Sequence, residues 1–268
     1  MKKFSLILLI AVSVISATAQ DSTLSRREMK NDRKEARRQK VNNLIRQAEE
    51  GVLIYRKQSI FGIQAKTNGY GVFYELGRMK SNRKTNIYRI DLTETKNAKE
   101  EKLLGGNLLF GNPFIYGKIN YLYPLTLGFG QQYILGQKGN KNGVAVSAIY
   151  NAGLVAGLLR PYYIEVVDDN GQSRTIKYSS EDSSLFLGNS IAGGGGFGKG
   201  WGEMKIKPGV FAKVAMRFDY GRFNESVSGL EIGMSLEAYG SKVPILLFEK
   251  EKRLFFQGYI AILFGRRK

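Results

Sequence analysis

The residue types that most enzymes use for acid–base and nucleophilic chemistry are missing from this sequence. Among its 268 residues there is no histidine and no cysteine. Histidine is the commonest general base, and cysteine supplies thiol nucleophiles and soft metal ligands. An enzyme built from Ser, Asp or Glu alone would lack these helpers. We therefore predict a protein that is not an enzyme and that needs neither a cofactor nor a metal.

One glycine-rich segment is similar in spacing to a nucleotide-binding loop. Residues 193–200 read GGGGFGKG and match a phosphate-binding loop up to Lys199. Gly200 then stands where Ser or Thr would bind Mg²⁺, and no helical pattern follows. We interpret the segment as a flexible loop tip that presents Phe197 and Trp201 for contacts.

Two acidic groups are also weak candidates for chemistry. Glu231 and Glu237 share one face of an expected strand. Six residues of strand span about 20 Å, which is too far for the two carboxylates of a glycosidase. Residues 168–171 read DDNG, which is typical of a turn, because a calcium site needs more oxygen ligands than this stretch supplies.

The chain begins with an export signal. Lys2 and Lys3 precede an apolar run at 4–15, and Ala17 and Ala19 provide small residues at a cleavage site. We predict that residues 1–19 are a cleaved signal peptide. The mature chain would then hold 39 basic and 23 acidic residues, a net charge of +16, and would contain no disulfide.

Residues 20–58 are predicted to form a basic arm that is helical or partly disordered. Residues 22–50 are rich in Arg, Lys, Glu and Gln and contain no Pro or Gly. This composition is typical of a helix, capped by Ser22 or Thr23 and ended by Gly51. Apolar residues are sparse in its first half, so we expect that half to be solvated. The arm has 11 basic and 6 acidic residues.

From residue 59 onward, apolar residues recur at every second position, as in strands with one buried face. Asn68-Gly69 between two such runs predicts a two-residue hairpin that pairs Thr67 with Tyr70 and Ala65 with Val72. With this hairpin, eight strands are expected in total. The other six are placed at 85–95, 125–135, 143–156, 208–220, 227–239 and 254–264. Pro124 cannot donate to a sheet, so the strand at 125–135 is expected to begin after it.

The connections between these strands alternate in length. Short turns are expected at 79–84, 136–142 and 221–226, whereas long loops are expected at 96–124, 157–207 and 240–253. Short turns at one end and long loops at the other are typical of outer-membrane barrels. Three aromatic residues stand where descending strands end, as an aromatic girdle requires: Tyr133, Tyr220 and Phe264. A soluble lipocalin-like barrel remains the alternative, because alternation does not say which face points inward.

On these features, residues 59–264 resemble the small eight-stranded outer-membrane barrels of the OmpA, OmpX and OmpW kind. The resemblance rests on the two-residue repeats, the loop asymmetry and Phe264 near the C-terminus. It implies an all-β, antiparallel, up-and-down transmembrane β-barrel of about eight strands. This barrel domain, residues 59–268, would lie in the bacterial outer membrane after an N-terminal periplasmic helical arm. Such barrels often stop at an aromatic residue, whereas residues 265–268 follow here.

The charged residues of the expected strands would face the interior of such a barrel. An eight-stranded barrel is only wide enough for side chains, so these charges must pair, and we predict a filled lumen without an open pore. The residues expected in this lumen network are Arg89, Asp91, Lys213, Arg217, Asp219, Glu231 and Glu237.

The short turns and the C-terminal tail are strongly basic, with Glu225 as their one acidic residue. Their cations predict a basic periplasmic rim, made of Arg78, Lys80, Arg83, Lys84, Lys138, Lys141, Arg222, Arg266, Arg267 and Lys268. The barrel wall would contact outer-membrane lipid. The rim and arm would attract an anionic periplasmic partner, such as peptidoglycan, phospholipid head groups or an acidic protein. A solvated charged face without a partner is the simpler alternative. Nucleic acid is not expected as a partner of an exported chain.

Two functions follow from this architecture. The first is a structural and interaction protein that acts through its outer loops and basic arm, as an accessory subunit of an envelope assembly or secretion complex. The second is the binding or passage of a small hydrophobic ligand, which the resemblance to OmpW-like barrels implies. The second function requires an apolar cavity, and the charged lumen residues disfavour one.

Overall fold

The computed structural model describes residues 26–49, 55–104, 112–139, 142–167, 171–188, 190–221 and 225–268. The chain divides into two compact units, residues 1–47 and 48–268. The signal peptide at 1–19, the proposed helix caps, Lys141, residues 168–170 and Arg222 lie outside the described residues.

The described part of the first unit lies in one long helix, α2 (Arg26–Glu49), whose last two residues fall in the second unit. Its sequence consists largely of strong helix formers, with no Gly or Pro to interrupt it. The side chains of residues 30–39, 41 and 42 are exposed. No apolar face is therefore buried along this stretch, as the composition predicted. Within the described ranges, no helix has both the length and the apolar character needed to cross a membrane.

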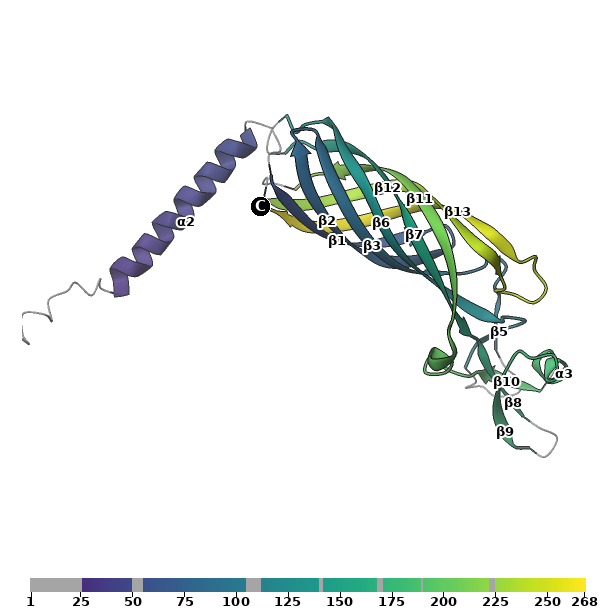
Figure 1. Cartoon of the computed structure of the whole chain (residues 1–268). Helices are drawn as coiled ribbons and strands as arrows, with labels where there is room; N and C mark the ends of the chain where they lie inside the picture. The colour runs from purple at the N-terminus through teal and green to yellow at the C-terminus, as the bar shows by residue number, and fades with distance from the viewer. Residues whose placement is uncertain are drawn as a thin grey trace, which may run out of the picture. The chain divides into compact units, whose positions relative to one another are not determined.

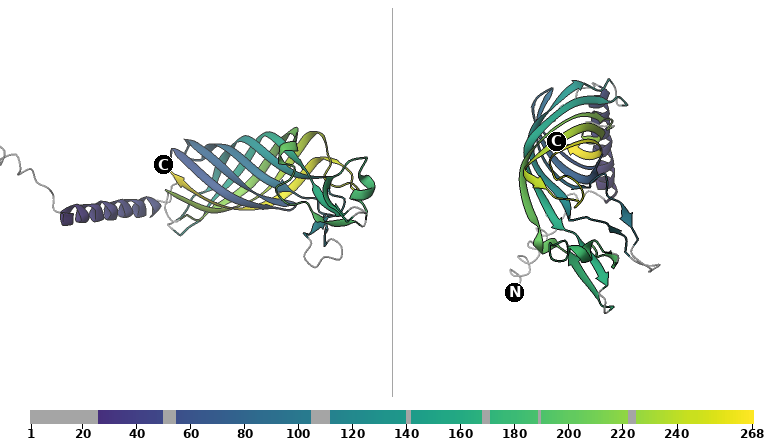
Figure 2. Two further views of the ribbon diagram at one scale, coloured as in Figure 1. Left: turned by 90° about the horizontal axis from the view of Figure 1, so that it is seen from below. Right: turned by 90° about the vertical axis from the view of Figure 1, so that its right-hand side faces the viewer.

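The second unit is built around a closed barrel of eight antiparallel strands (Figures 1 and 2). The strands are β1 (Lys57–Lys66), β2 (Gly69–Ser81), β3 (Lys84–Thr95), β6 (Asn120–Gly136), β7 (Ala145–Pro161), β11 (Lys205–Asp219), β12 (Ser226–Val243) and β13 (Lys252–Arg267). Each strand pairs with the barrel strands before and after it in sequence, and β13 closes the ring on β1. The predicted up-and-down barrel fold is confirmed.

The first hairpin has a different register from the predicted one. Ala65 pairs with Tyr70 rather than Val72, and the turn is formed by Thr67 and Asn68 instead of Asn68 and Gly69. The predicted turn type places positive φ at both central residues, and Gly69 has no positive φ. Gly69 instead lies so close to β3 that a Cβ would meet the Glu94 carbonyl oxygen at 1.8 Å. The error is two residues, so every side chain keeps its predicted face.

Most strands are longer than predicted, and the strand expected to begin after Pro124 includes that residue. Pro124 pairs with Gly157 of β7. On its other side, the pairing of β6 with β3 jumps from Leu125 to Leu122. Proline is tolerated because the β3 ladder is interrupted at that point.

The two ends of the barrel have the predicted asymmetry. At one end, which we call the turn end, the connections are residues 82–83, 137–144 and 220–225. At the other, the loop end, residues 96–119, 162–204 and 244–251 connect the strands, together with the Thr67-Asn68 turn. The loop 96–119 contains the short pair β4 (Lys102–Leu103) and β5 (Phe114–Ile115).

Residues 162–204 form a small folded unit, which we call the outer subdomain. It contains β8 (Tyr163–Val167), β9 (Ser173–Lys177), α3 (Ser183–Phe186), β10 (Ile191–Gly194) and η2 (Trp201–Glu203). The strands form a sheet in the order β10-β8-β9, beyond the barrel end opposite the C-terminus (Figure 1). The prediction of a flexible tip at 193–200 is wrong for Gly193 and Gly194, which lie in β10. A Cβ on Gly193 would meet the Asn112 carbonyl oxygen at 2.6 Å.

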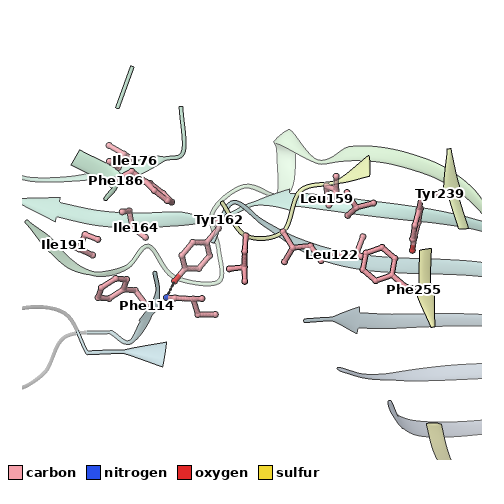
Figure 3. Close-up of a cluster of buried hydrophobic side chains, with 14 of the residues drawn as sticks. Phe114, Leu122, Leu159, Tyr162, Ile164, Ile176, Phe186, Ile191, Tyr239 and Phe255 are labelled. Atoms are coloured by element: carbon pink, nitrogen blue, oxygen red, sulfur yellow. Dashed lines mark hydrogen bonds between the residues drawn. The ribbon is translucent and has the colours of Figure 1, made fainter. Parts of the chain in front are cut away.

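An apolar core closes the loop end of the barrel. Inward-facing barrel residues such as Leu122, Leu159, Tyr239 and Phe255 continue without a break into the core of the outer subdomain (Figure 3). Tyr162 joins the outer subdomain to the loop 96–119, since its hydroxyl accepts a 2.9 Å hydrogen bond from the backbone N–H of Ile115. The long loops therefore fold over the barrel mouth instead of extending separately into solvent.

Candidate functional site

The barrel interior at mid-height is ionic. Arg89, Asp91, Lys213, Arg217 and Glu231, five of the seven predicted lumen residues, lie there with at most 4% of each exposed. They come from β3, β11 and β12, and they alternate with outward-facing apolar neighbours. A two-residue repeat on neighbouring strands therefore brings residues distant in sequence into one cluster.

Two arginines hold this cluster together. Arg217 donates to both oxygens of Glu75, at 2.8 and 2.7 Å, and to Glu231 Oε2 at 2.7 and 3.0 Å. Arg89 Nη1 donates to Glu231 Oε1 at 2.7 Å, and its guanidinium lies 3.5 Å from the ring centroid of Phe73. Such charge-assisted, bidentate contacts are the strong class of side-chain hydrogen bonds.

Asp91 links the second half of the cluster. Its Oδ1 accepts hydrogen bonds from Lys213 Nζ at 2.8 Å and from Arg89 Nε at 3.2 Å. Gln64 and Thr126 donate to the same carboxylate. The cluster thus balances three cations against three carboxylates when Glu75 is counted, as buried charges require.

The other two predicted lumen residues are buried but lie apart from this cluster. Glu237 accepts hydrogen bonds from Lys66 Nζ at 3.1 Å and from the Tyr239 hydroxyl at 2.9 Å. Asp219 lies at the turn end, where Arg267 Nη2 is 2.6 Å and Lys138 Nζ is 3.6 Å from its carboxylate. Glu231 and Glu237 therefore have separate partners and do not form a catalytic pair.

Sequence reasoning missed several members of the interior network, among them a carboxylate, a lysine and a tyrosine. Glu75, Lys66 and Tyr259 face inward and are at least nine-tenths buried. The Tyr259 hydroxyl donates to Glu231 Oε1 at 2.7 Å. The signal for all three was present, because each stands on the face of its strand opposite the exposed apolar residues.

The basic rim needs a correction at two positions. Lys138 and Arg267 are only 5% and 4% exposed, because both turn inward to Asp219. Lys138 Nζ also donates to the Gly221 carbonyl. Burial is the main cause of the lowered pKa of Lys138. The exposed cations of the predicted rim are Arg78, Lys80, Arg83, Lys84, Arg266 and Lys268.

On the outer wall at the loop end, Arg160 is surrounded by aromatic rings. It lies 4.4 Å from the ring centroid of Tyr121, 4.9 Å from that of Phe197 and 4.6 Å from that of Trp201. Its Nη1 donates to the Phe197 carbonyl at 2.8 Å, and the Trp201 indole donates to the same oxygen. The two aromatics interpreted as contact residues therefore attach the outer subdomain to the barrel, although Phe197 remains 72% exposed.

Within the described ranges, no group of three or more Asp or Glu residues could hold a metal ion. The outward face of β2, β3, β6 and β7 has a shallow apolar groove of about 520 Å³. Gly128 and Gly153 lie among its lining residues, together with Leu127, Phe129 and Leu154. This hollow lies on the wall of the barrel and not in its interior.

No protein-family model and no curated protein matches this sequence. Several solved structures are similar to it, among them the following three. The N-terminal β-barrel domain of Pseudomonas aeruginosa OprF is 8% identical, with 79% of this chain and 99% of that one covered, at a TM-score of 0.36. Ail, the attachment invasion locus protein of Yersinia pestis, is 11% identical, with 80% of this chain and 100% of that one covered, at a TM-score of 0.36. Neisserial surface protein A is 10% identical, with 79% of this chain and 96% of that one covered, at a TM-score of 0.36. The fold assignment rests on this chain's own strand register.

Proposed function

We propose that this chain is a non-enzymatic barrel of the bacterial outer membrane, exported by a cleaved signal peptide. It acts as a structural and interaction protein through its outer subdomain and basic arm, as an accessory subunit of an envelope assembly or secretion complex. The observation that carries the proposal is the inverted polarity of the barrel, with apolar side chains outside and charges inside.

The inversion is plain within single strands. On β11, the side chains of Val214 and Met216 are 52% and 44% exposed. The next residue, Arg217, points to the opposite face and is 1% exposed. On β12, Ile232 is 44% exposed beside the fully buried Glu231. A barrel in water would reverse this pattern to bury its apolar surface. Acyl chains are the surroundings in which such a wall is stable, so the polarity disfavours the lipocalin-like alternative.

The interaction role is supported by the way the loops are folded. The outer subdomain has its own sheet and shares a core with the barrel mouth, so its surface is presented in a fixed conformation. Rigid scaffolds that present loops are typical of binding proteins. Passage of a hydrophobic ligand is disfavoured, because the mid-height interior is ionic and the loop end is filled by the apolar core.

Cell fractionation combined with a heat-modifiability gel tests the membrane assignment. We expect the protein in the outer-membrane fraction, with folded and boiled samples migrating differently. A soluble periplasmic band with no shift on boiling would overturn the assignment.

Deletion of residues 21–50 tests the role of the arm. We expect the truncated barrel to keep its heat-dependent gel shift and to lose co-purification with its envelope partner. A matched control keeps the arm length but replaces its sequence by a neutral linker. Retention of the partner by both variants would contradict the role of the arm.

A further inference from the structure

Five exposed cations lie side by side at the turn end of four neighbouring strands. β13, β1, β2 and β3 are consecutive around the ring. The cations, which we call the basic arc, are Lys57, Arg78, Lys80, Lys84 and Arg266.

Each member of the basic arc continues an outward-facing apolar row. Lys57 follows the row of Phe61, Arg78 and Lys80 follow that of Leu76, and Arg266 follows that of Phe264. Phe61, Leu76 and Phe264 are 49%, 47% and 55% exposed. Because strand side chains stand perpendicular to the sheet, these cations point sideways into whatever surrounds the wall.

The basic arc also contains like charges in register. Lys57 lies directly opposite Arg78 in the pairing of β1 with β2. Like charges opposite each other in a sheet repel. Among the described residues, no carboxylate forms an ion pair with Lys57 or Arg78. An external anion would remove this repulsion.

The other half of the ring differs. At the turn end of β6, the outward position is taken by Leu135, which is 53% exposed. Just past the turn end of β11, it is taken by Tyr220, which is 52% exposed. Lys138, in the turn that follows β6, is buried against Asp219. Among the described strand residues, the outward cations of this end are therefore confined to one side.

We infer that the basic arc binds anionic phospholipid head groups of the leaflet at the turn end. The inference rests on the proposed membrane insertion and names one of the anionic partners of the rim. Peptidoglycan and soluble proteins would approach along the barrel axis and meet the turns, where Arg83 lies. The arc cations instead border the apolar band, at the level where lipid phosphates surround a barrel.

The test uses the full mature chain folded in vesicles that contain both phosphatidylcholine and phosphatidylglycerol. Spin-labelled forms of each lipid report which one is immobilised at the protein surface. We expect phosphatidylglycerol to be preferred and high salt to weaken the preference. The arc variant carries Lys57→Gln, Arg78→Gln, Lys80→Gln and Lys84→Gln. In this variant, the preference for phosphatidylglycerol over phosphatidylcholine should fall by at least about fivefold. This is the change in affinity expected from the loss of a single cation near an anionic surface.

The matched control removes four exposed cations near the loop end, through Lys102→Gln, Lys205→Gln, Lys250→Gln and Lys252→Gln. It should keep the wild-type preference. An inserted, heat-modifiable arc variant with unchanged preference would overturn the inference and leave the membrane assignment intact. Displacement of the lipid by soluble peptidoglycan fragments would also overturn it. Failure of all proteins to insert would instead contradict the proposed function.

Discussion

Arg217 and Glu75, which lie 142 residues apart in the chain, face each other across the barrel interior in a two-pronged ion pair. Both side chains are completely buried. Glu231 links Arg217 to Arg89, with a 2.7 Å contact to each arginine. Such a network is costly to break and nearly neutral to replace as a whole.

Glu75→Gln should therefore destabilise the barrel strongly. It leaves Arg217 buried with one charge partner fewer, and the expected loss is about 3–5 kcal/mol of unfolding free energy. Urea unfolding of the reconstituted protein, followed by the circular dichroism of its strands, measures it. The exposed Glu101→Gln is the control and should change stability by less than about 0.5 kcal/mol.

The double variant Glu75→Gln, Arg217→Met provides a further check. Because it removes both charges, its loss should be smaller than the sum of the single losses. Equal losses for Glu75→Gln and Glu101→Gln would show that the interior is hydrated enough to solvate an arginine that has lost one of its two carboxylate partners.

The filled interior predicts that the purified protein has no porin-sized conductance. Ion pairs occupy mid-height, and the apolar core that includes Leu122, Tyr239 and Phe255 closes the loop end. Planar bilayer recordings of the wild-type protein should show no steps of porin size. Regular large steps from protein that is demonstrably folded would contradict the sealed lumen.

Arg160 should hold the outer subdomain on the barrel. Lysine cannot reproduce the flat guanidinium that faces Tyr121, Phe197 and Trp201, so Arg160→Lys should cost about 2 kcal/mol of local stability. Limited proteolysis should then cut within residues 162–204, while the gel shift of the barrel persists. Arg253→Lys, at an exposed position, should leave the cleavage pattern unchanged. Identical patterns for both variants would exclude this role.

The attachment of η2 to β9 should depend on pH. The hydrogen bond from Lys177 is the main cause of the lowered pKa of Glu203, with a further contribution from the Tyr163 hydroxyl at 2.6 Å. The same pair raises the pKa of Lys177. The stabilisation that Glu203 gives to this contact is present above its ordinary pKa of 4.5. It is lost as pH falls through the lower pKa of Glu203 in the folded protein. The stabilisation from Lys177 is present below its ordinary pKa of 10.5. It is lost as pH rises through the higher pKa of Lys177 in the folded protein.

The protection of the backbone amides of residues 201–203 against hydrogen exchange, relative to their intrinsic exchange rate at each pH, should therefore be greatest between about pH 5 and 10. The effect should be modest and weakened by salt, because both side chains are about half exposed. Glu203→Gln should abolish the loss of protection at low pH, which is the acid limb of this pH profile. An acid limb that survives in this variant would assign it to another group.

The barrel could be predicted because its signal is repeated in every strand. The alternation around Val214 and Ile232, the connection lengths and the parity of Arg217 and Glu231 are each local properties of the sequence. Strand ends were harder, since β6 and β7 continue into the loop end through residues whose partners lie in distant segments. The outer subdomain was missed altogether, because the short strands β8, β9 and β10 are stabilised by a core shared with Phe114 and Leu122.

The interior site was predictable in membership but not in pairing. Parity places Arg89 and Asp91 inside, but only the stagger between neighbouring strands decides which carboxylate meets which cation. The same limit explains Lys138 and Arg267, which composition assigned to a solvated rim. Their inward turn depends on Asp219, a partner that neither turn sequence reveals.

The first hairpin offers a direct test of register. In the observed register, Gly69 follows the turn and approaches β3 so closely that a Cβ would overlap the Glu94 carbonyl oxygen. Gly69→Ala should therefore force β2 and β3 apart and cost about 1–3 kcal/mol of unfolding free energy. Gly136→Ala is the control, because no atom lies within 4 Å of its Cβ position and its φ is not positive. It should be neutral or stabilising by up to about 1 kcal/mol. If the two substitutions have the same small effect in urea unfolding, β2 and β3 are not in such close contact at Gly69 and the register is wrong.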